Sequence, residues 1–145
     1  MDVSSSIIVM PATTADHASI SGIETMIVGD DRLADHLQET LVHEQCWLAR
    51  IDIHPVGFVV SNQTFFGYGF VETLATHPDY RHQGVGTALM RHIESVCPTD
   101  RLFTSTNASN IRMQRLCLSL GYRVSGYVDN LDEGDPELIY VKHLR

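Results

Sequence analysis

The stretch from Arg81 to Met90, Arg-His-Gln-Gly-Val-Gly-Thr-Ala-Leu-Met, constrains the fold more than any other part of this sequence. It follows an apolar, β-like run at residues 70–76 that ends at His77-Pro78, and beyond Gly84 apolar residues recur as on one face of a helix. Glycines in such a loop let another molecule approach the N–H groups of the helix start, where the helix dipole favours phosphate. The order of strand, glycine loop and helix therefore predicts a phosphate site, although glycine spacing alone also describes a tight turn.

Two familiar phosphate loops are excluded by the same residues. A P-loop ends in Gly-Lys-Ser/Thr, and this stretch has no lysine; a dinucleotide fingerprint needs a third glycine where this chain has Leu89. The remaining pattern, Arg-x-x-Gly-x-Gly, resembles the acetyl-coenzyme A pyrophosphate loop of the GNAT acyltransferase superfamily. The approach to the loop, residues 74–81, is similar to the same family, in which an apolar strand ends in x-Pro-x-Tyr-Arg.

A second stretch, residues 110–122, resembles another signature of this superfamily. That signature has an asparagine, a small or apolar residue three positions later, then Leu-Tyr, and then Gly-Phe or Gly-Tyr. Asn110, Leu116, Gly121 and Tyr122 match it. The position of the usual tyrosine holds Cys117 instead, so the chain departs from the family pattern at a residue that can act as an acid.

The rest of the chain predicts short strands and helices in alternation. We expect strands at residues 6–10, 46–51, 56–60, 69–76, 101–105, 122–128 and 138–141. We expect helices at residues 15–27, 32–44, 85–97 and 110–120, the first of them capped by Thr13 or Thr14. Gly29-Asp30-Asp31 should break the chain between the first two helices, and residues 61–68 should form a connection between strands. With the resemblance, this order implies an α/β (α+β) GNAT-like fold, in which a mixed, mostly antiparallel central sheet of about six to seven strands carries about four helices on both faces. We expect residues 1–145 to form a single acyltransferase domain.

The composition of the chain argues against several classes of protein. The chain has 18 acidic and 10 basic side chains and a formal charge of −8, which argues against a nucleic-acid-binding protein because such proteins need a basic face. Cys46, Cys97 and Cys117 are an odd number without paired spacing, so we expect no disulfide framework, no zinc site and a reducing compartment. The histidines are scattered, and no metal is expected. The N-terminus lacks a basic region and a long apolar stretch, which predicts no signal peptide, no membrane segment and a cytoplasmic location.

The resemblance implies acetyl-coenzyme A as co-substrate. Loop amides would bind its pyrophosphate, and the side chain of Arg81 would position the loop or meet a phosphate. The backbone of Leu74 and Thr76 would pair with pantetheine as an added strand, and an amide near Leu74 would polarise the thioester carbonyl. Asn110 would hydrogen-bond pantetheine, unless it serves only as a helix cap. The implied cofactor-binding set is Leu74, Thr76, Arg81, His82, Gln83, Gly84, Val85, Gly86, Thr87 and Asn110.

The implied reaction is direct attack of a neutral amine on the thioester. Because alkylamines are mostly protonated at neutral pH, a general base is useful, and Glu72 is the candidate, since its side chain shares a strand face with Leu74 and Thr76. An exposed, solvated carboxylate is the alternative for Glu72. Cys117 could protonate the leaving thiolate, or it could be a buried packing residue, in which case water or another hydroxyl such as Tyr68 supplies the proton.

The function expected from these residues is N-acetyl transfer from acetyl-coenzyme A to a primary amine. The acceptor would be a small-molecule amine or a protein amine. A non-catalytic sensor or regulatory module that binds acetyl-coenzyme A or coenzyme A is the alternative, because the usual tyrosine is missing. The sequence is compatible with a homodimer and does not decide the oligomeric state.

Overall fold

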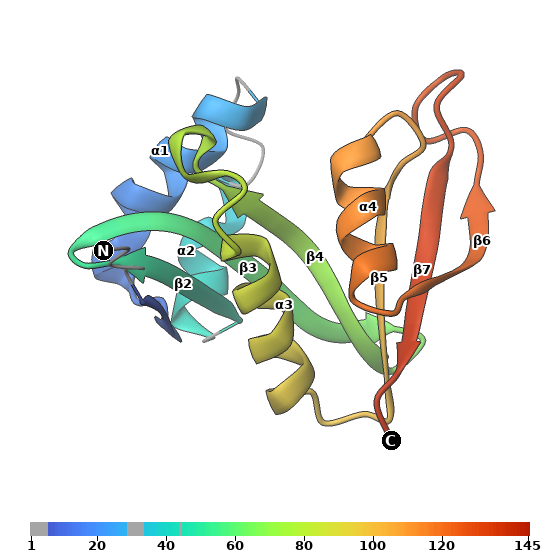
Figure 1. Ribbon diagram of the computed structural model, residues 1–145, viewed down its shortest axis with the longest axis horizontal. Coiled ribbons are helices and arrows are strands. Elements are labelled where there is room, and N and C mark those ends of the chain that lie inside the picture. The colour runs from blue at the N-terminus through green and yellow to red at the C-terminus, as the bar shows by residue number, and fades with distance from the viewer. Residues whose placement is uncertain (1–5, 29–33, 44) are drawn as a thin grey trace, which may run out of the picture. The chain divides into compact units, whose positions relative to one another are not determined.

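The structure, a computed structural model, describes residues 6–28, 34–43 and 45–145. The strands are β1 (Ile7–Pro11), β2 (Cys46–Ile51), β3 (His54–Phe65), β4 (Tyr68–Thr76), β5 (Arg101–Asn107), β6 (Arg123–Val128) and β7 (Glu137–His143), and the helices are α1 (His17–Val28), α2 (Ala34–Val42), α3 (Val85–Val96) and α4 (Ile111–Ser119) (Figure 1). The strands form one sheet in the order β1-β2-β3-β4-β5-β7-β6. Strands β4 and β5 pair in parallel, and β1–β2, β2–β3, β5–β7 and β6–β7 pair antiparallel. The predicted mixed, mostly antiparallel sheet is confirmed.

The predicted connection at residues 61–68 is wrong. Strand β3 continues to Phe65, and β4 begins at Tyr68, so only Phe66 and Gly67 join them. Both loop residues have positive φ, 53° and 85°, the pattern of a tight type I′ hairpin turn. Residues 61–65 are polar except for Phe65, and their strand conformation comes from pairing with a neighbouring strand, which intrinsic β-propensity does not report.

The first predicted helix begins later than expected. Thr13 caps a short 3₁₀ turn, η1 (Thr14–Asp16), by accepting a hydrogen bond from the N–H of Ala15, while the carboxylate of Asp16 accepts from the N–H of Thr13 at 2.8 Å. This reciprocal capping box confirms Thr13 as the cap. The predicted break at residues 29–31, and the ends of the second predicted helix at 32–33 and at 44, lie outside the described residues.

The chain divides into two compact units, the first made of Met1–Ser61 with Thr73–Ile93 and the second of Asn62–Glu72 with Glu94–Arg145. In the first unit, helices pack on both faces of β3. Phe58 belongs to a buried cluster with residues of α1 and α2. On the opposite face, a Cβ added at Gly57 would lie 2.7 Å from the carbonyl oxygen of Ala75 and 2.8 Å from Cγ1 of Val85. Glycine at this position therefore lets the start of α3 pack closely on the strand.

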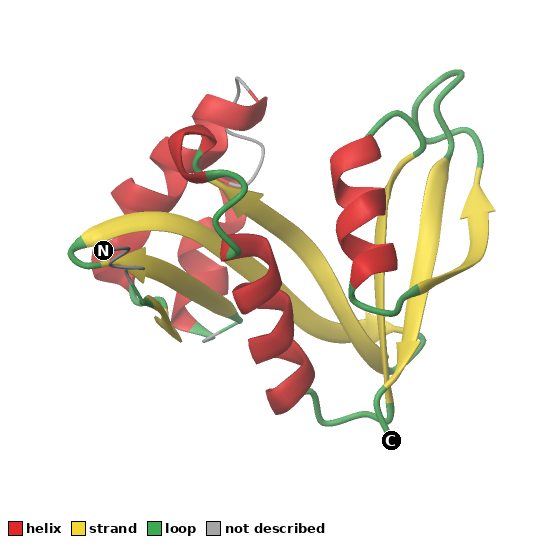
Figure 2. Ribbon diagram, viewed as in Figure 1, coloured by secondary structure: helices red, strands yellow, loops and turns green. Residues whose placement is uncertain are grey.

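The second unit has its own half-buried polar cluster. The hydroxyl of Tyr122 donates to Oε2 of Glu94 at 2.8 Å, and Nζ of Lys142 donates to Oε1 of the same carboxylate at 3.0 Å. Burial, and then the contact with Glu94, raises the pKa of Tyr122. Helix α4 lies on one face of β5 and β7 (Figure 2). Across the described ranges, we find no helix with both the length and the apolar character needed to span a membrane.

Candidate functional site

The path from β4 into the glycine loop is held by His77. Its N–H donates to the carbonyl oxygen of Val56 at 2.8 Å, and its Nδ1 accepts from the N–H of Asp79 at 3.1 Å. The second bond caps a short 3₁₀ turn, η2 (Pro78–Tyr80), and places the proton of a neutral His77 ring on Nε2. The chain therefore leaves the sheet along a defined route before it reaches Arg81.

Two residues of the loop then have left-handed backbone conformations. His82 has φ 63° and Gly84 has φ 86°, and helix α3 begins directly afterwards at Val85. The first bond of the helix runs from the N–H of Ala88 to the carbonyl oxygen of Gly84 at 2.9 Å. The N–H groups of residues 85–87 thus precede the first helical bond and have no partner four residues back. Residues 82–84 are exposed, and Gly86 and Thr87 are half-buried, so the start of the helix lies at the surface and its positive end favours an anion there.

Strand β4 carries the other predicted cofactor contacts and the candidate base. Ala75 is buried, whereas Leu74 and Thr76 are half-buried on the alternate face of the strand. Glu72 is exposed on the same face as Leu74, and its Oε2 accepts a hydrogen bond from Nδ2 of Asn62 at 3.0 Å. The side-chain amide of Asn62 therefore orients the carboxylate from the neighbouring strand.

Asn110 caps helix α4. Its Oδ1 accepts a hydrogen bond from the N–H of Met113 at 3.1 Å, which confirms the helix-cap interpretation. The residue is exposed, and among the described residues its Nδ2 makes no hydrogen bond. The cap uses only the oxygen of the amide, so the nitrogen remains available as a donor to a ligand.

Cys117 lies in the interior of the second unit. It is fully buried on α4, and burial raises the pKa of its thiol to about 11. The thiol is therefore neutral at physiological pH. Full burial is typical of a cysteine that packs as a small apolar residue.

Replacing Cys117 with serine is expected to lower the free energy of unfolding by about 1–3 kcal/mol, because a more polar hydroxyl then occupies an apolar position. We expect kcat to stay near that of the wild type. Urea unfolding and steady-state kinetics on the same preparation would measure both. In the unfolded chain the thiol has its ordinary pKa of 9.0, whereas in the folded chain burial raises this pKa to about 11. The folded state is therefore stabilised fully below pH 9, and this stabilisation is lost as the pH rises towards about 11. Serine does not ionise in this range, so the serine variant should lose less stability there. A loss of turnover without a loss of stability would contradict a packing role.

The predicted residues belong to different units. Leu74, Thr76 and the loop from Arg81 to Thr87 are in the first unit, whereas Glu72, Asn110 and Cys117 are in the second. Sequence reasoning missed two features of the site. The first is the left-handed backbone of His82, although histidine is enriched in that conformation, and the second is the bond from Asn62 to Glu72, which had no signal in the sequence. Within the described ranges, no group of three His, Cys, Asp or Glu side chains could hold a metal ion.

This chain resembles known proteins in both sequence and fold. The family described as "Acetyltransferase (GNAT) family" matches residues 17–122. A crystal structure of a GNAT-family acetyltransferase from Bacillus cereus ATCC 10987 is 31% identical, with a TM-score of 0.91, over 95% of this chain and 97% of that one.

Two more distant structures share the fold. The first is yncA, a putative acetyltransferase from Salmonella typhimurium with its cofactor acetyl-CoA, at 19% identity and TM-score 0.76 over 96% of this chain and 94% of that one. The second is Arabidopsis thaliana Naa50 in complex with the bisubstrate analogue CoA-Ac-MVNAL, at 14% identity and TM-score 0.78 over 94% and 98%. Comparison with curated proteins gave no match. Because the family match spans most of the sequence, the chain belongs to the GNAT acetyltransferase family.

Proposed function

We propose that this chain is an acetyl-coenzyme A-dependent N-acetyltransferase that moves the acetyl group to a primary amine. The observation that carries the proposal is the exposed loop before Val85, whose backbone presents the unpaired N–H groups of a helix start in a GNAT-family chain. The structural relatives with acetyl-CoA and with a bisubstrate analogue support the choice of cofactor. Because the family match includes residues of both units, we also propose that residues 1–145 act as one acyltransferase domain.

The cofactor would lie along β4 and the loop. The N–H groups from Gln83 to Thr87 would bind the pyrophosphate, and Arg81 would hold the loop or meet a phosphate. Leu74 and Thr76 are half-buried residues, and their backbone would pair with pantetheine as an added strand. The unused Nδ2 of Asn110 is a suitable donor to a pantetheine carbonyl, while its Oδ1 keeps capping α4.

The reaction would be a direct transfer. Glu72, acting through a water molecule or directly, would take a proton from the attacking amine, whose nitrogen forms the new bond to the thioester carbon. An N–H near Leu74 would stabilise the oxyanion of the tetrahedral intermediate. The carbon–sulfur bond then breaks, and coenzyme A leaves as a thiolate. The hydrogen bond from Nδ2 of Asn62 helps to orient the Glu72 carboxylate.

The leaving thiolate would take its proton from water. Transfer from Cys117 is unfavourable because its pKa of about 11 is well above the reference thiol value of about 8.5. Full burial of Cys117 also opposes direct contact with a substrate. We therefore assign Cys117 to packing of α4 and not to catalysis.

The acceptor is a small-molecule amine or a protein amine, and an acceptor screen tests the proposal. Purified protein with acetyl-coenzyme A would be presented with polyamines, amino acids, aminoglycosides and peptides with free N-termini, and released coenzyme A thiol would be measured. We expect amine-dependent thiol release with at least one class, accompanied by a mass increase of one acetyl group in the acceptor. Tight cofactor binding without turnover on any amine would contradict catalysis and would favour a cofactor-binding module.

A further inference from the structure

The second unit has a sheet face that its own helix does not cover. Thr104 and Tyr140 are paired across β5 and β7, and both are buried. Burial, and then the nearby Cys117 of α4, raises the pKa of Tyr140, which places the tyrosine on the face that α4 covers. Adjacent residues of a strand point to opposite faces, so Phe103 and Ile139 lie on the face away from α4. Neither of these two side chains is fully buried.

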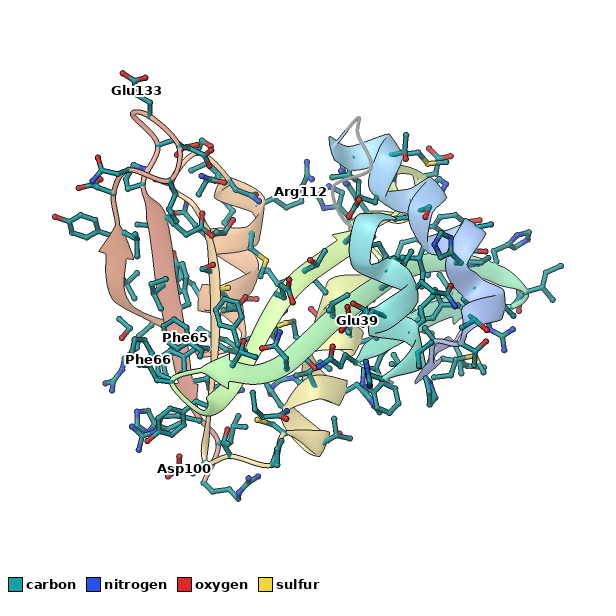
Figure 3. The ribbon with its side chains drawn as sticks, turned by 180° about the vertical axis from the view of Figure 1, so that it is seen from behind. Glu39, Phe65, Phe66, Asp100, Arg112 and Glu133 are labelled. Carbon is teal, nitrogen blue, oxygen red and sulfur yellow. The ribbon has the colours of Figure 1, made fainter. Side chains whose placement is uncertain are left out.

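Aromatic rings gather on this face. Phe65 stacks on Phe70 with ring centroids 5.2 Å apart, and it also meets Phe103 at 4.7 Å and the edge of Phe66 at 5.1 Å. Figure 3 shows Phe65 and Phe66 at the end of the β3–β4 hairpin. We call the group Phe65, Phe66, Phe70, Phe103 and Ile139 the aromatic face. Aromatic side chains are enriched at the centres of protein interfaces.

Phe66 is the least expected member of the aromatic face. Its side chain is 87% exposed, and its backbone has φ 53°, a conformation that bulky residues rarely adopt. The first position of a type I′ turn favours asparagine, aspartate or glycine. Neither local backbone preference nor burial among the described residues accounts for phenylalanine here, which indicates contact with another surface.

Opposite charges flank the aromatic face along β7. At one end, Arg101 is paired with His143 in the sheet register, and a guanidinium nitrogen of Arg123 lies 3.5 Å from Nε2 of His143. Asp100 is the acidic residue at this end, and it pairs with Arg101. At the other end lies the acidic segment 129–137, which contains no lysine or arginine. Glu137 accepts a hydrogen bond from the hydroxyl of Ser105, which shares the face with Phe103.

This order of basic end, apolar centre and acidic end is self-complementary. A two-fold axis that lies between two copies stacked face to face, parallel to their sheets and perpendicular to their strands, reverses the strand direction, so each basic end meets the acidic end of the other copy. We propose that the aromatic face is the contact surface of a homodimer of this chain. Opposite potentials at both ends favour this orientation over the parallel one, which would bring like charges together.

Sedimentation velocity of the full chain between about 1 and 100 μM would test the dimer. We expect the wild type to dimerise within this range. Phe66→Asn should raise the dimer dissociation constant by about tenfold or more, because it removes the most exposed ring of the aromatic face. The same change should leave the melting temperature of the dissociated chain unchanged or higher, since asparagine suits the turn. Ile53→Asn, at an 80% exposed position in another turn, is the matched control and should leave dimerisation unchanged.

Charge exchange tests the orientation of the two copies. Arg123→Glu and Glu137→Arg should each weaken the dimer, and the double variant should recover affinity relative to either single change. A wild type that stays monomeric throughout, a Phe66→Asn chain that dimerises like the wild type, or an equal effect of Ile53→Asn would overturn the proposal. A double variant weaker than both single variants would overturn the two-fold arrangement.

Discussion

Replacing Gly86 with valine is expected to lower the affinity for acetyl-coenzyme A by about 100-fold or more, because hydrogen bonds to a charged group contribute about 1.5–3 kcal/mol each and at least two would be lost. Gly86 is the second residue of α3 and lies beside the exposed loop residues. A branched side chain there would stand between the N–H groups of the first turn and the pyrophosphate. Titration calorimetry with acetyl-coenzyme A would measure the loss.

Gly22→Val is the matched control for this change. Gly22 also lies in a helix, α1, and a Cβ added at this position meets nothing within 4 Å. Both substitutions place valine where a helix tolerates it better than glycine, so both variants should fold. Wild-type affinity in Gly86→Val, with the fold intact, would refute the assignment of the loop to the pyrophosphate.

Changing Glu72 to glutamine is expected to lower kcat by about 100-fold, the smaller end of the range for a general base, while the KM for acetyl-coenzyme A changes little. The amide keeps the size of the side chain and can still bond with Asn62, but it cannot accept the proton of the amine. Because Glu72 is exposed, the substitution should leave the free energy of unfolding nearly unchanged. Initial rates with the best acceptor, measured across pH, would report the effect.

Two further variants make the test of Glu72 specific. Glu133→Gln removes the same charge from an exposed carboxylate in the acidic segment 129–137 and should retain wild-type kcat. Asn62→Ala removes the donor 3.0 Å from Glu72 and should lower kcat by a smaller factor, because the carboxylate is present but less well oriented. Wild-type rates for Glu72→Gln at every pH would remove this residue from the mechanism.

The phosphate-loop half of the candidate site could be predicted from the sequence because its causes are local. A glycine pair after an apolar strand and before an amphipathic helix can be recognised without tertiary contacts, and α3 begins at Val85 as the spacing indicates. The helix-cap alternative for Asn110, which was weighed against a contact with pantetheine, likewise depends on local sequence, because its side chain bonds within its own turn. Even where the function of a residue stays a prediction, its local conformation followed from its immediate neighbours.

The features that escaped prediction depend on residues distant in sequence or on unusual backbone angles. Residues 61–65 have the polar composition that is typical of loops, but they form a strand that pairs with β4. Asn62, the hydrogen-bond partner of Glu72, was therefore expected in a connection and not in a strand. His82 and Phe66 adopt positive φ without being glycine; histidine is enriched at such angles but seldom adopts them, and phenylalanine gives no signal of them. Long-range pairing and strained turns are determined by the whole fold and not by a short window of sequence.

Because the cysteines are buried, the reaction of their thiols with a reagent can report local unfolding of the chain. Cys46 and Cys117 have no exposed surface, and Cys97 is 7% exposed. Burial raises the pKa of Cys46 to about 12, with a smaller contribution from Asp16, so both fully buried thiols are also chemically quiet in the native state. A disulfide reagent added to the folded chain should therefore react only when a segment opens. Mass spectrometry of single-cysteine variants would then time the exposure of β2, of the α3–β5 connection and of α4 separately.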